Sequence, residues 1–201
     1  MTSFWDERYQ TEAYVFGEQP NAFLASQADL VRRHKRALAV ADGEGRNGVW
    51  LAEQGLEVVS IDASAVGLDK ARRLAARRHV VIETVLADLA AFEWPEAAFD
   101  LVVAIFIQFA GPPLRDSIFR GIKRTLKPGG SLILEGYRPE QLAFGTGGPR
   151  QAGNLYTRAM LEEAFADMQI VHLHEHDSAV SEGSGHAGMS ALIDLVARKP
   201  Q

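Results

Sequence analysis

The sequence predicts an α/β fold, in which a Rossmann-like, doubly wound sheet of seven strands is mostly parallel and ends in a C-terminal antiparallel hairpin. Three observations support this fold class. Short apolar runs without polar alternation, typical of strands covered on both faces, alternate with helical patterns. A glycine-rich turn follows the first run. The Gly/Ser-rich connection over 178–189 is too short for a crossover helix, which favours antiparallel pairing of the strands beside it.

The same patterns give the order of the elements. The apolar and β-branched runs predict strands over 37–41, 57–61, 80–85, 101–107, 131–134, 169–177 and 190–198. Amphipathic spacing and capping residues predict helices from about residue 21, over 46–54, from the N-cap Ser64 to about residue 78, and from Pro112 to before Pro128. The alternation of strand and helix implies right-handed crossovers.

Composition excludes several classes of protein. Of 201 residues, 47% are hydrophobic and 23% are charged, so the chain can bury a core and is not disordered. The net charge of −5 argues against a nucleic-acid partner, and we interpret the arginines at 72, 73, 77 and 78 as a solvated helix face. The absence of cysteine excludes disulfides, thiolate metal sites and cysteine nucleophiles.

No targeting or membrane segment is expected. Residues 1–10 carry charges of both signs without an apolar run, unlike a signal peptide. The most apolar stretch, 101–107, is far shorter than the roughly 20 residues of a membrane helix. We therefore expect a cytoplasmic monomer or homodimer that does not bind a membrane.

The glycine-rich turn has the spacing of a nucleotide-binding loop. Gly43, Gly45 and Gly48 form G-x-G-x-x-G between a strand and a helix, and Asp62 follows Gly43 by 62 − 43 = 19 residues at the end of the next strand. Exposed N–H groups at the start of a helix attract electron-rich groups. A carboxylate at the end of the next strand can bind a ribose diol. These features suit any cofactor that contains adenosine, so alone they do not separate NAD from S-adenosylmethionine.

Longer segments of the sequence distinguish S-adenosylmethionine from NAD as the expected cofactor. They are ALAVADGEGRNGVWLAEQG, SIDAS, ADLAAF at 87–92, FDLVVAIFIQF at 99–109 and LKPGGSLILEGY at 126–137. In these segments the sequence resembles the class I S-adenosylmethionine-dependent methyltransferases, and among them the small tellurite-resistance and thiopurine-methyltransferase-like group. The resemblance implies methyl transfer from S-adenosylmethionine to a small-molecule acceptor such as a thiol or a metalloid. The alternatives are an NAD-binding oxidoreductase and a non-catalytic S-adenosylmethionine-binding protein.

The resemblance also implies a single domain, 1–201, whose parts have different functions. Residues 1–36 would form a capping segment and helix, 37–137 the cofactor-binding core, and 138–201 a substrate-side loop, helix and hairpin. The glycine loop would face the methionine part of the cofactor, Asp62 the ribose, Asp88 the adenine, and Phe106 the sulfonium region. The full set of implied cofactor-binding residues is Asp42, Gly43, Glu44, Gly45, Asn47, Asp62, Ala63, Asp88, Leu89, Ile105 and Phe106.

Two residues depart from the pattern of the family. Ala39 stands where such proteins usually have an acidic residue, and Ala41 stands where they have glycine. We expect Asp42 or Glu44 to replace the missing carboxylate. The extra methyl group of Ala41 would narrow the approach of the backbone to the cofactor.

Catalytic and acceptor-binding residues are assigned from loops and strand ends. An acceptor that is already nucleophilic needs no base, whereas a hydroxyl or an amine does, and His186 or Tyr137 is then the candidate. His186 is expected in a flexible, exposed glycine loop. The expected acceptor-binding residues, in an aromatic lid and a glycine-rich loop that binds anions, are Trp5, Tyr9, Arg138 and Gly147. Simple packing of a capping helix and a plain surface loop are the alternatives.

Three histidines alternate along one predicted strand, at 172, 174 and 176. They project from one face of that strand, where three imidazoles are able to ligate zinc. The alternation also fits the solvated face of an edge strand, with Val171 and Leu173 turned inward. We favour this second interpretation and expect no metal.

Overall fold

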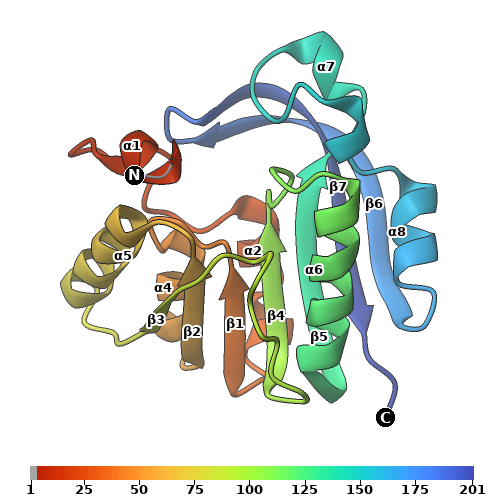
Figure 1. Ribbon diagram of the computed structural model, residues 1–201, viewed down its shortest axis with the longest axis horizontal. Helices are drawn as coiled ribbons and strands as arrows, with labels where there is room; N and C mark the ends of the chain where they lie inside the picture. The colour runs from red at the N-terminus through yellow and green to blue at the C-terminus, as the bar shows by residue number, and fades with distance from the viewer. Residues whose placement is uncertain (1–3) are drawn as a thin grey trace.

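The computed structural model describes residues 4–201 and has a seven-stranded sheet in the order β3-β2-β1-β4-β5-β7-β6 (Figure 1). β1 to β5 are parallel, and β7 runs antiparallel to β5 and to β6. The predicted fold class is therefore confirmed. The strands are β1 Arg36–Val40, β2 Glu57–Asp62, β3 Glu83–Leu86, β4 Phe99–Ile105, β5 Leu126–Tyr137, β6 Gln169–Glu182 and β7 His186–Arg198.

The helices begin where their capping residues predict. Asn21 caps the short helix α2 (Ala22–Ser26) by accepting from the amide of Leu24 at 2.9 Å, and Ser64 caps the longer α5 (Ala65–Arg77) by accepting from Gly67 at 3.0 Å. The helices are α1 Phe4–Tyr9, α2 Ala22–Ser26, α3 Ala28–Val31, α4 Arg46–Glu53, α5 Ala65–Arg77, α6 Pro112–Thr125, α7 Gln141–Phe144 and α8 Arg158–Ala164, with a 3-10 turn η1 at Ala152–Asn154.

The parallel strands are buried on both faces, which explains their continuous apolar sequences. In β1, Leu38 and Val40 pack into the core shared with α6 and α8, whereas Ala37 and Ala39 face the core shared with α2, α3 and α4. Because successive side chains point to opposite faces, one apolar run serves both cores.

Three sequence expectations are corrected. β3 is shorter than predicted, and Val81, expected within it, is 88% exposed. The expected loop over 178–189 is mostly strand, because β6 and β7 continue to a tight turn over 183–185. Val171 is 61% exposed and not turned inward, because a bulge between Ile170 and His172 shifts the register of β6.

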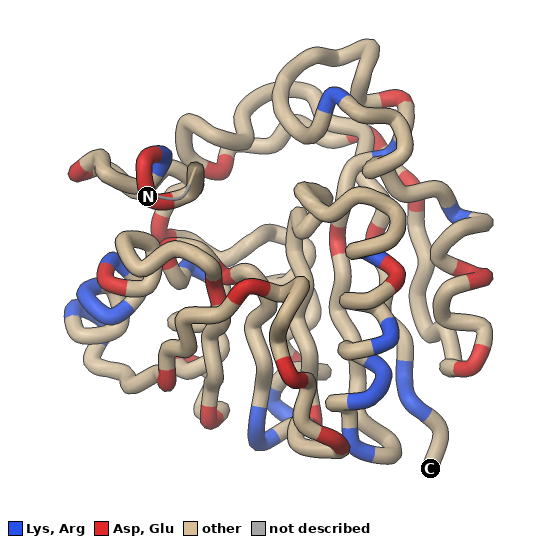
Figure 2. Tube along the Cα trace, in the orientation of Figure 1, with Lys and Arg blue, Asp and Glu red and all other residues tan. Residues whose placement is uncertain are grey.

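Basic residues gather on α5 and the lower half of α6 (Figure 2). On α5 they form exposed ion pairs, as expected of a solvated helix face, which join Arg72 to Asp69, Arg77 to Glu18 and Arg78 to Glu53. Among the described residues, no helix has the length and apolar character that a membrane crossing requires.

Candidate functional site

A cavity lies at the carboxyl ends of β1, β2 and β4, beneath the N-terminal segment. This is the edge at which open α/β sheets bind ligands. Most residues predicted for the site line it: Trp5, Tyr9, Asp42, Gly43, Glu44, Asn47, Asp62, Ala63, Asp88, Leu89, Ile105, Phe106 and His186. Gly45, Tyr137, Arg138 and Gly147 do not line it.

The glycine loop is held in a conformation that its glycines require. Gly43 has φ +57°, and a Cβ at that position would lie 2.6 Å from the hydroxyl of Tyr9. Gly45, with φ +89°, allows α4 to pack on α5, because its Cβ would lie 2.5 Å from that of Ala71. Gly45 does not itself line the cavity and serves the contact between the two helices, and the expectation that its backbone faces the cofactor stays a prediction.

Asp62 ends β2 and connects the glycine loop to the start of α5. One carboxylate oxygen accepts from the amide of Gly43 and the other from Ser64, both at 2.8 Å. Burial raises the pKa of Asp62 above its usual value, although these amides favour the charged form. Each oxygen keeps a second lone pair, so the carboxylate can still accept from a ligand in the cavity.

Asp42 holds the first turn of α4. Its carboxylate accepts from the amide of Gly48 at 3.1 Å and from the hydroxyl of Ser60 at 2.8 Å. A Cβ on Gly48 would collide with this carboxylate, which explains the third glycine of the motif. Burial raises the pKa of Asp42 to about 7, against the opposing effect of these hydrogen bonds.

Glu44 has a structural role that the sequence does not reveal. It forms an ion pair of 2.5 Å with Lys70 of α5, and each residue is only 3% exposed. The second carboxylate oxygen accepts from the amides of Val15 and Phe16 at 2.8 and 3.3 Å. Lys70 in turn donates to carbonyl groups of the N-terminal segment at Tyr9, Thr11 and Ala13. The pair fastens residues 9–16 over the cavity.

The aromatic segment forms the predicted cover and also packs as a capping helix. Trp5 stacks on Tyr9 with ring centroids 5.8 Å apart and meets Phe109 edge-on at 6.2 Å. Asp6 accepts from the hydroxyl of Ser64 at 2.6 Å, which fastens α1 to the N-terminus of α5. Trp5, Tyr9 and Phe109 all line the cavity.

Two strand ends at the cavity have a left-handed backbone. Ala41 after β1 has φ +49° and Phe106 after β4 has φ +55°, a region that L-residues other than glycine seldom adopt. Residues held in such conformations tend to cluster at functional sites.

Asp88 and Leu89 complete this edge of the sheet. The Asp88 carboxylate accepts from Ala90 at 2.9 Å and is exposed toward the cavity, so it has both the turn-capping and the site position foreseen for it.

Arg46 is a cavity residue that the sequence analysis missed. It is 7% exposed, and its Nη2 donates to Glu182 at 2.6 Å. Its Nη1 is buried and has no hydrogen-bond partner among residues 4–201. A signal was present, because Arg46 directly follows the second glycine of the loop and begins α4.

His186 begins β7 and is packed, which corrects the expectation of a flexible, exposed loop. Its side chain is 12% exposed and its ring lies 4.6 Å from Phe16 and 4.4 Å from Phe106, centroid to centroid. The Nδ1 atom lies 3.8 Å from a carboxylate oxygen of Glu182, too far for a hydrogen bond, and has no hydrogen-bond partner among the described residues. Burial lowers the pKa of His186 despite this carboxylate, so the imidazole is neutral at pH 7.

Three residues expected near the acceptor lie elsewhere. Tyr137 is 1% exposed behind Phe106, on which its ring stacks at 4.7 Å, and burial raises its pKa. The guanidinium of Arg138 is already paired with Asp177 at 2.5 Å and with a carboxylate of α7. Gly147 adjoins the Tyr137 hydroxyl, outside the cavity.

Comparison with known sequences agrees with this geometry. Residues 37–130 match the family model described as a methyltransferase domain. A demethylmenaquinone methyltransferase of Thermus thermophilus is 35% identical over 119 residues, which cover 58% of this chain and 54% of that protein. An uncharacterized methyltransferase of Synechocystis, sll0829, is 31% identical over 65% of this chain and 60% of its own length. The matches thus span less than two thirds of either relative.

Solved structures share the whole architecture. A chain described by the conversion of a disulfide bond into a thioacetal group in echinomycin biosynthesis has a TM-score of 0.81 at 16% identity, with 100% of this chain and 92% of that one covered. TehB of Haemophilus influenzae has 0.73 at 18%, over 98% and 66%. The N-methyltransferase NodS of Bradyrhizobium japonicum, in complex with S-adenosyl-L-homocysteine, has 0.70 at 14%, over 98% and 97%.

These findings define the class of protein. The chain has the fold of the class I S-adenosylmethionine-dependent methyltransferases, and the resemblance to this class found in the sequence is confirmed. Residues 37–130, which match the methyltransferase-domain family model, carry the glycine loop, Asp62 and Asp88.

Proposed function

We propose that this protein transfers the methyl group of S-adenosylmethionine to a small nucleophilic acceptor. The observation that carries the proposal is the set of polar groups at the cavity. The buried Nη1 of Arg46 has no partner among the described residues and would hold the cofactor carboxylate. Asp62 would accept from the ribose hydroxyls and Asp88 from the adenine amino group, with Leu89 beside the ring.

The chain's own residues would contribute orientation and exclusion of water. When bound, S-adenosylmethionine supplies an activated methyl group that a nucleophile displaces in line. Polar contacts at both ends of the cavity fix the ligand, and Trp5, Tyr9 and Phe109 cover it from the N-terminal side and from the loop after β4. Positioning and shielding of this kind account for much of the barrier reduction in bimolecular transfers.

The acceptor we favour is already nucleophilic, such as a thiolate or a reduced metalloid. The description of the echinomycin neighbour also names sulfur chemistry. The only imidazole that lines the described cavity belongs to His186, which is neutral and held by aromatic rings. An acceptor hydroxyl or amine would need this group as a base. Tyr137 is less suited, because its hydroxyl is buried and its pKa is raised.

A methyl-transfer screen tests the proposal. The protein is incubated with radiolabelled S-adenosylmethionine and separate panels of thiols, metalloids, amines and phenols. We expect label in a thiol or metalloid product. Tight cofactor binding without turnover on any panel would favour the non-catalytic alternative, and selective binding of NAD(H) would favour the oxidoreductase.

A further inference from the structure

A second cluster of potential ligands lies on the sheet face toward α2, apart from the cofactor cavity. Glu135 of β5, Asp194 of β7 and His174 of β6 are direct cross-strand partners, so their side chains share one face. His172 and His176 flank His174 on the same strand. None of these five residues lines the cavity described above.

Asp194 lies at the centre of the cluster and is incompletely satisfied. It is 5% exposed, and its Oδ2 accepts from Nε2 of His176 at 2.9 Å. Its Oδ1 is buried without a hydrogen-bond partner among residues 4–201. Leaving a buried hydrogen-bond acceptor unpaired is costly, so an occupant for Oδ1 would be stabilising.

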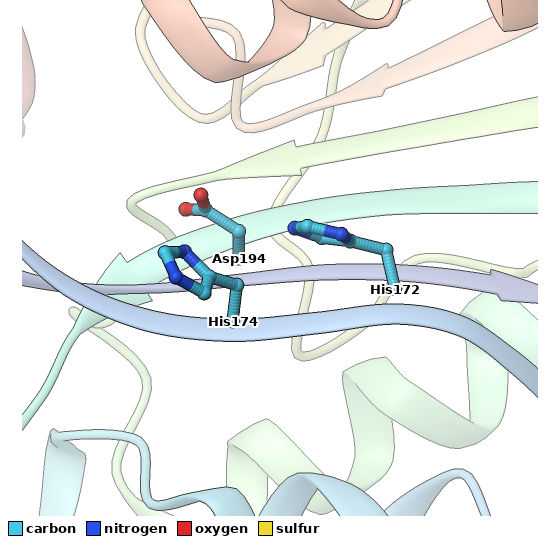
Figure 3. A group of neighbouring side chains, drawn as sticks. All are labelled: His172, His174 and Asp194. Carbon is cyan, nitrogen blue, oxygen red and sulfur yellow. The ribbon is translucent and has the colours of Figure 1, made fainter.

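The three histidines differ in their hydrogen bonds. The ring nitrogens of His176 have partners, whereas those of His172 and His174 are available to bind a metal ion. His176 uses both ring nitrogens, since Nδ1 lies 2.8 Å from the hydroxyl of Ser178 and Nε2 contacts Asp194. His172 and His174 make ring contacts, with Phe23 and with each other, but in the described chain no hydrogen bond involves their nitrogens. Figure 3 shows both imidazoles rising from the same side of the sheet as the Asp194 carboxylate.

We propose that His172, His174 and Asp194 bind a divalent transition-metal ion, with Zn²⁺ as the best chemical match. Two imidazoles and one carboxylate are common zinc ligands, and a water molecule would complete a tetrahedral shell. Their ligand atoms all lie within 4.8 Å of one another. Side-chain rotations would bring them to the spacing of about 3.4 Å that bonds of about 2.0–2.1 Å require. His176 would orient the ligating carboxylate from behind.

The surrounding charge favours a cation. Glu135 is buried beside Asp194, its direct cross-strand partner, and its Oε1 accepts from the side-chain amide of Asn21 at 2.7 Å. A metal ion or a proton beside two neighbouring buried carboxyl groups offsets their repulsion. A proton shared by Glu135 and Asp194 is the competing occupant, and it requires neither His172 nor His174.

Calorimetry on untagged, chelator-treated protein titrated with ZnCl₂ tests the site. We expect one equivalent to bind, and His172→Ala and His174→Ala each to weaken it by about 10- to 100-fold or more. His79→Asn, which removes an exposed histidine outside the cluster, is the matched control and should leave zinc binding unchanged. Co²⁺ should give the intense visible bands of four-coordinate cobalt in the wild type and lose them in His174→Ala.

Two outcomes of the zinc titration would contradict the proposal. No heat of binding up to about 1 mM zinc, or binding unaffected by both substitutions, would overturn the proposal and leave the shared proton as the occupant. Circular dichroism of the two variants checks that they fold. S-adenosylhomocysteine binding should be the same in both, because neither residue lines the cofactor cavity, so this result is independent of the proposed activity.

Discussion

The guanidinium of Arg46 donates a hydrogen bond of 2.6 Å to the carboxylate of Glu182, 136 residues further along the chain. This contact joins the first turn after the glycine loop to the end of β6, where the hairpin arches over to α1 (Figure 1). The contacts with His186 and Arg46 outweigh the burial of Glu182 and hold its pKa at about 2. Arg46 thereby keeps one nitrogen fixed, while its buried Nη1 has no hydrogen-bond partner among the described residues.

Arg46→Ala should weaken S-adenosylhomocysteine binding by roughly 10- to 100-fold. The reason is the loss of a charge-assisted hydrogen bond to the ligand carboxylate, worth about 1.5–3 kcal/mol. Calorimetry measures the change. Arg33→Ala, at an exposed arginine remote from the cavity, is the control. Equal dissociation constants for Arg46→Ala and the wild type would remove Arg46 from the ligand site.

Glu44→Gln should destabilise the fold and loosen the N-terminal cover. The substitution keeps acceptors for Val15 and Phe16 but leaves the ammonium of Lys70 buried without its counter-ion. Breaking a buried pair in this way costs about 3–5 kcal/mol, which urea denaturation would register. The double variant Glu44→Gln/Lys70→Met should recover part of the loss. A single variant as stable as the wild type would contradict the structural role of the pair.

Asp42 should make the protein less stable as pH rises from about 4 to about 8. Its folded-state pKa of about 7 exceeds the unfolded value of 3.8, so across this window the folded state retains a proton that the unfolded state has released. Rising pH removes that advantage. Asp42→Asn should therefore raise the melting temperature relative to the wild type more at pH 8 than at pH 5. A gain that does not change with pH would contradict this sign.

His186→Ala should lower the methyl-transfer rate by less than about tenfold, below the 10²–10⁴-fold typical of a general base. The expectation follows from an acceptor that is already nucleophilic. With a thiol acceptor, any loss should shrink as pH rises and the thiolate forms without help. Initial rates from pH 6 to 9 provide the measurement. A large loss that does not depend on pH would show instead that His186 is the base.

The fold was predictable where apolar runs repeat, because parallel strands covered on both faces have continuous apolar sequences without polar alternation. The extension of β6 and β7 was not, since residues 178–189 pair mainly with each other and leave many side chains exposed. Their Gly/Ser-rich composition therefore resembles a loop. The same error placed His186 in an exposed loop, although Phe16 and Phe106 bury it.

The positions of Asp62 and Asp88 at the cavity were predictable, because each residue follows the end of a strand. The site was not predictable where a residue's partner is distant in sequence. Glu44 was assigned to the cofactor because the sequence around it does not reveal its ion pair with Lys70 of α5. Arg46 was missed because its orientation depends on Glu182. Such pairings follow from tertiary packing, and no periodicity reveals them.

The most direct test of the account is a comparison of S-adenosylhomocysteine with NADH, by calorimetry and by thermal unfolding of the same protein. S-adenosylhomocysteine at 100 times its dissociation constant should add about 2.7 kcal/mol of stability, or about 5–10 °C in a chain of this size. Asp62→Asn should reduce that shift, and NADH should produce none. Selective binding of NADH, with no response to S-adenosylhomocysteine, would contradict the account.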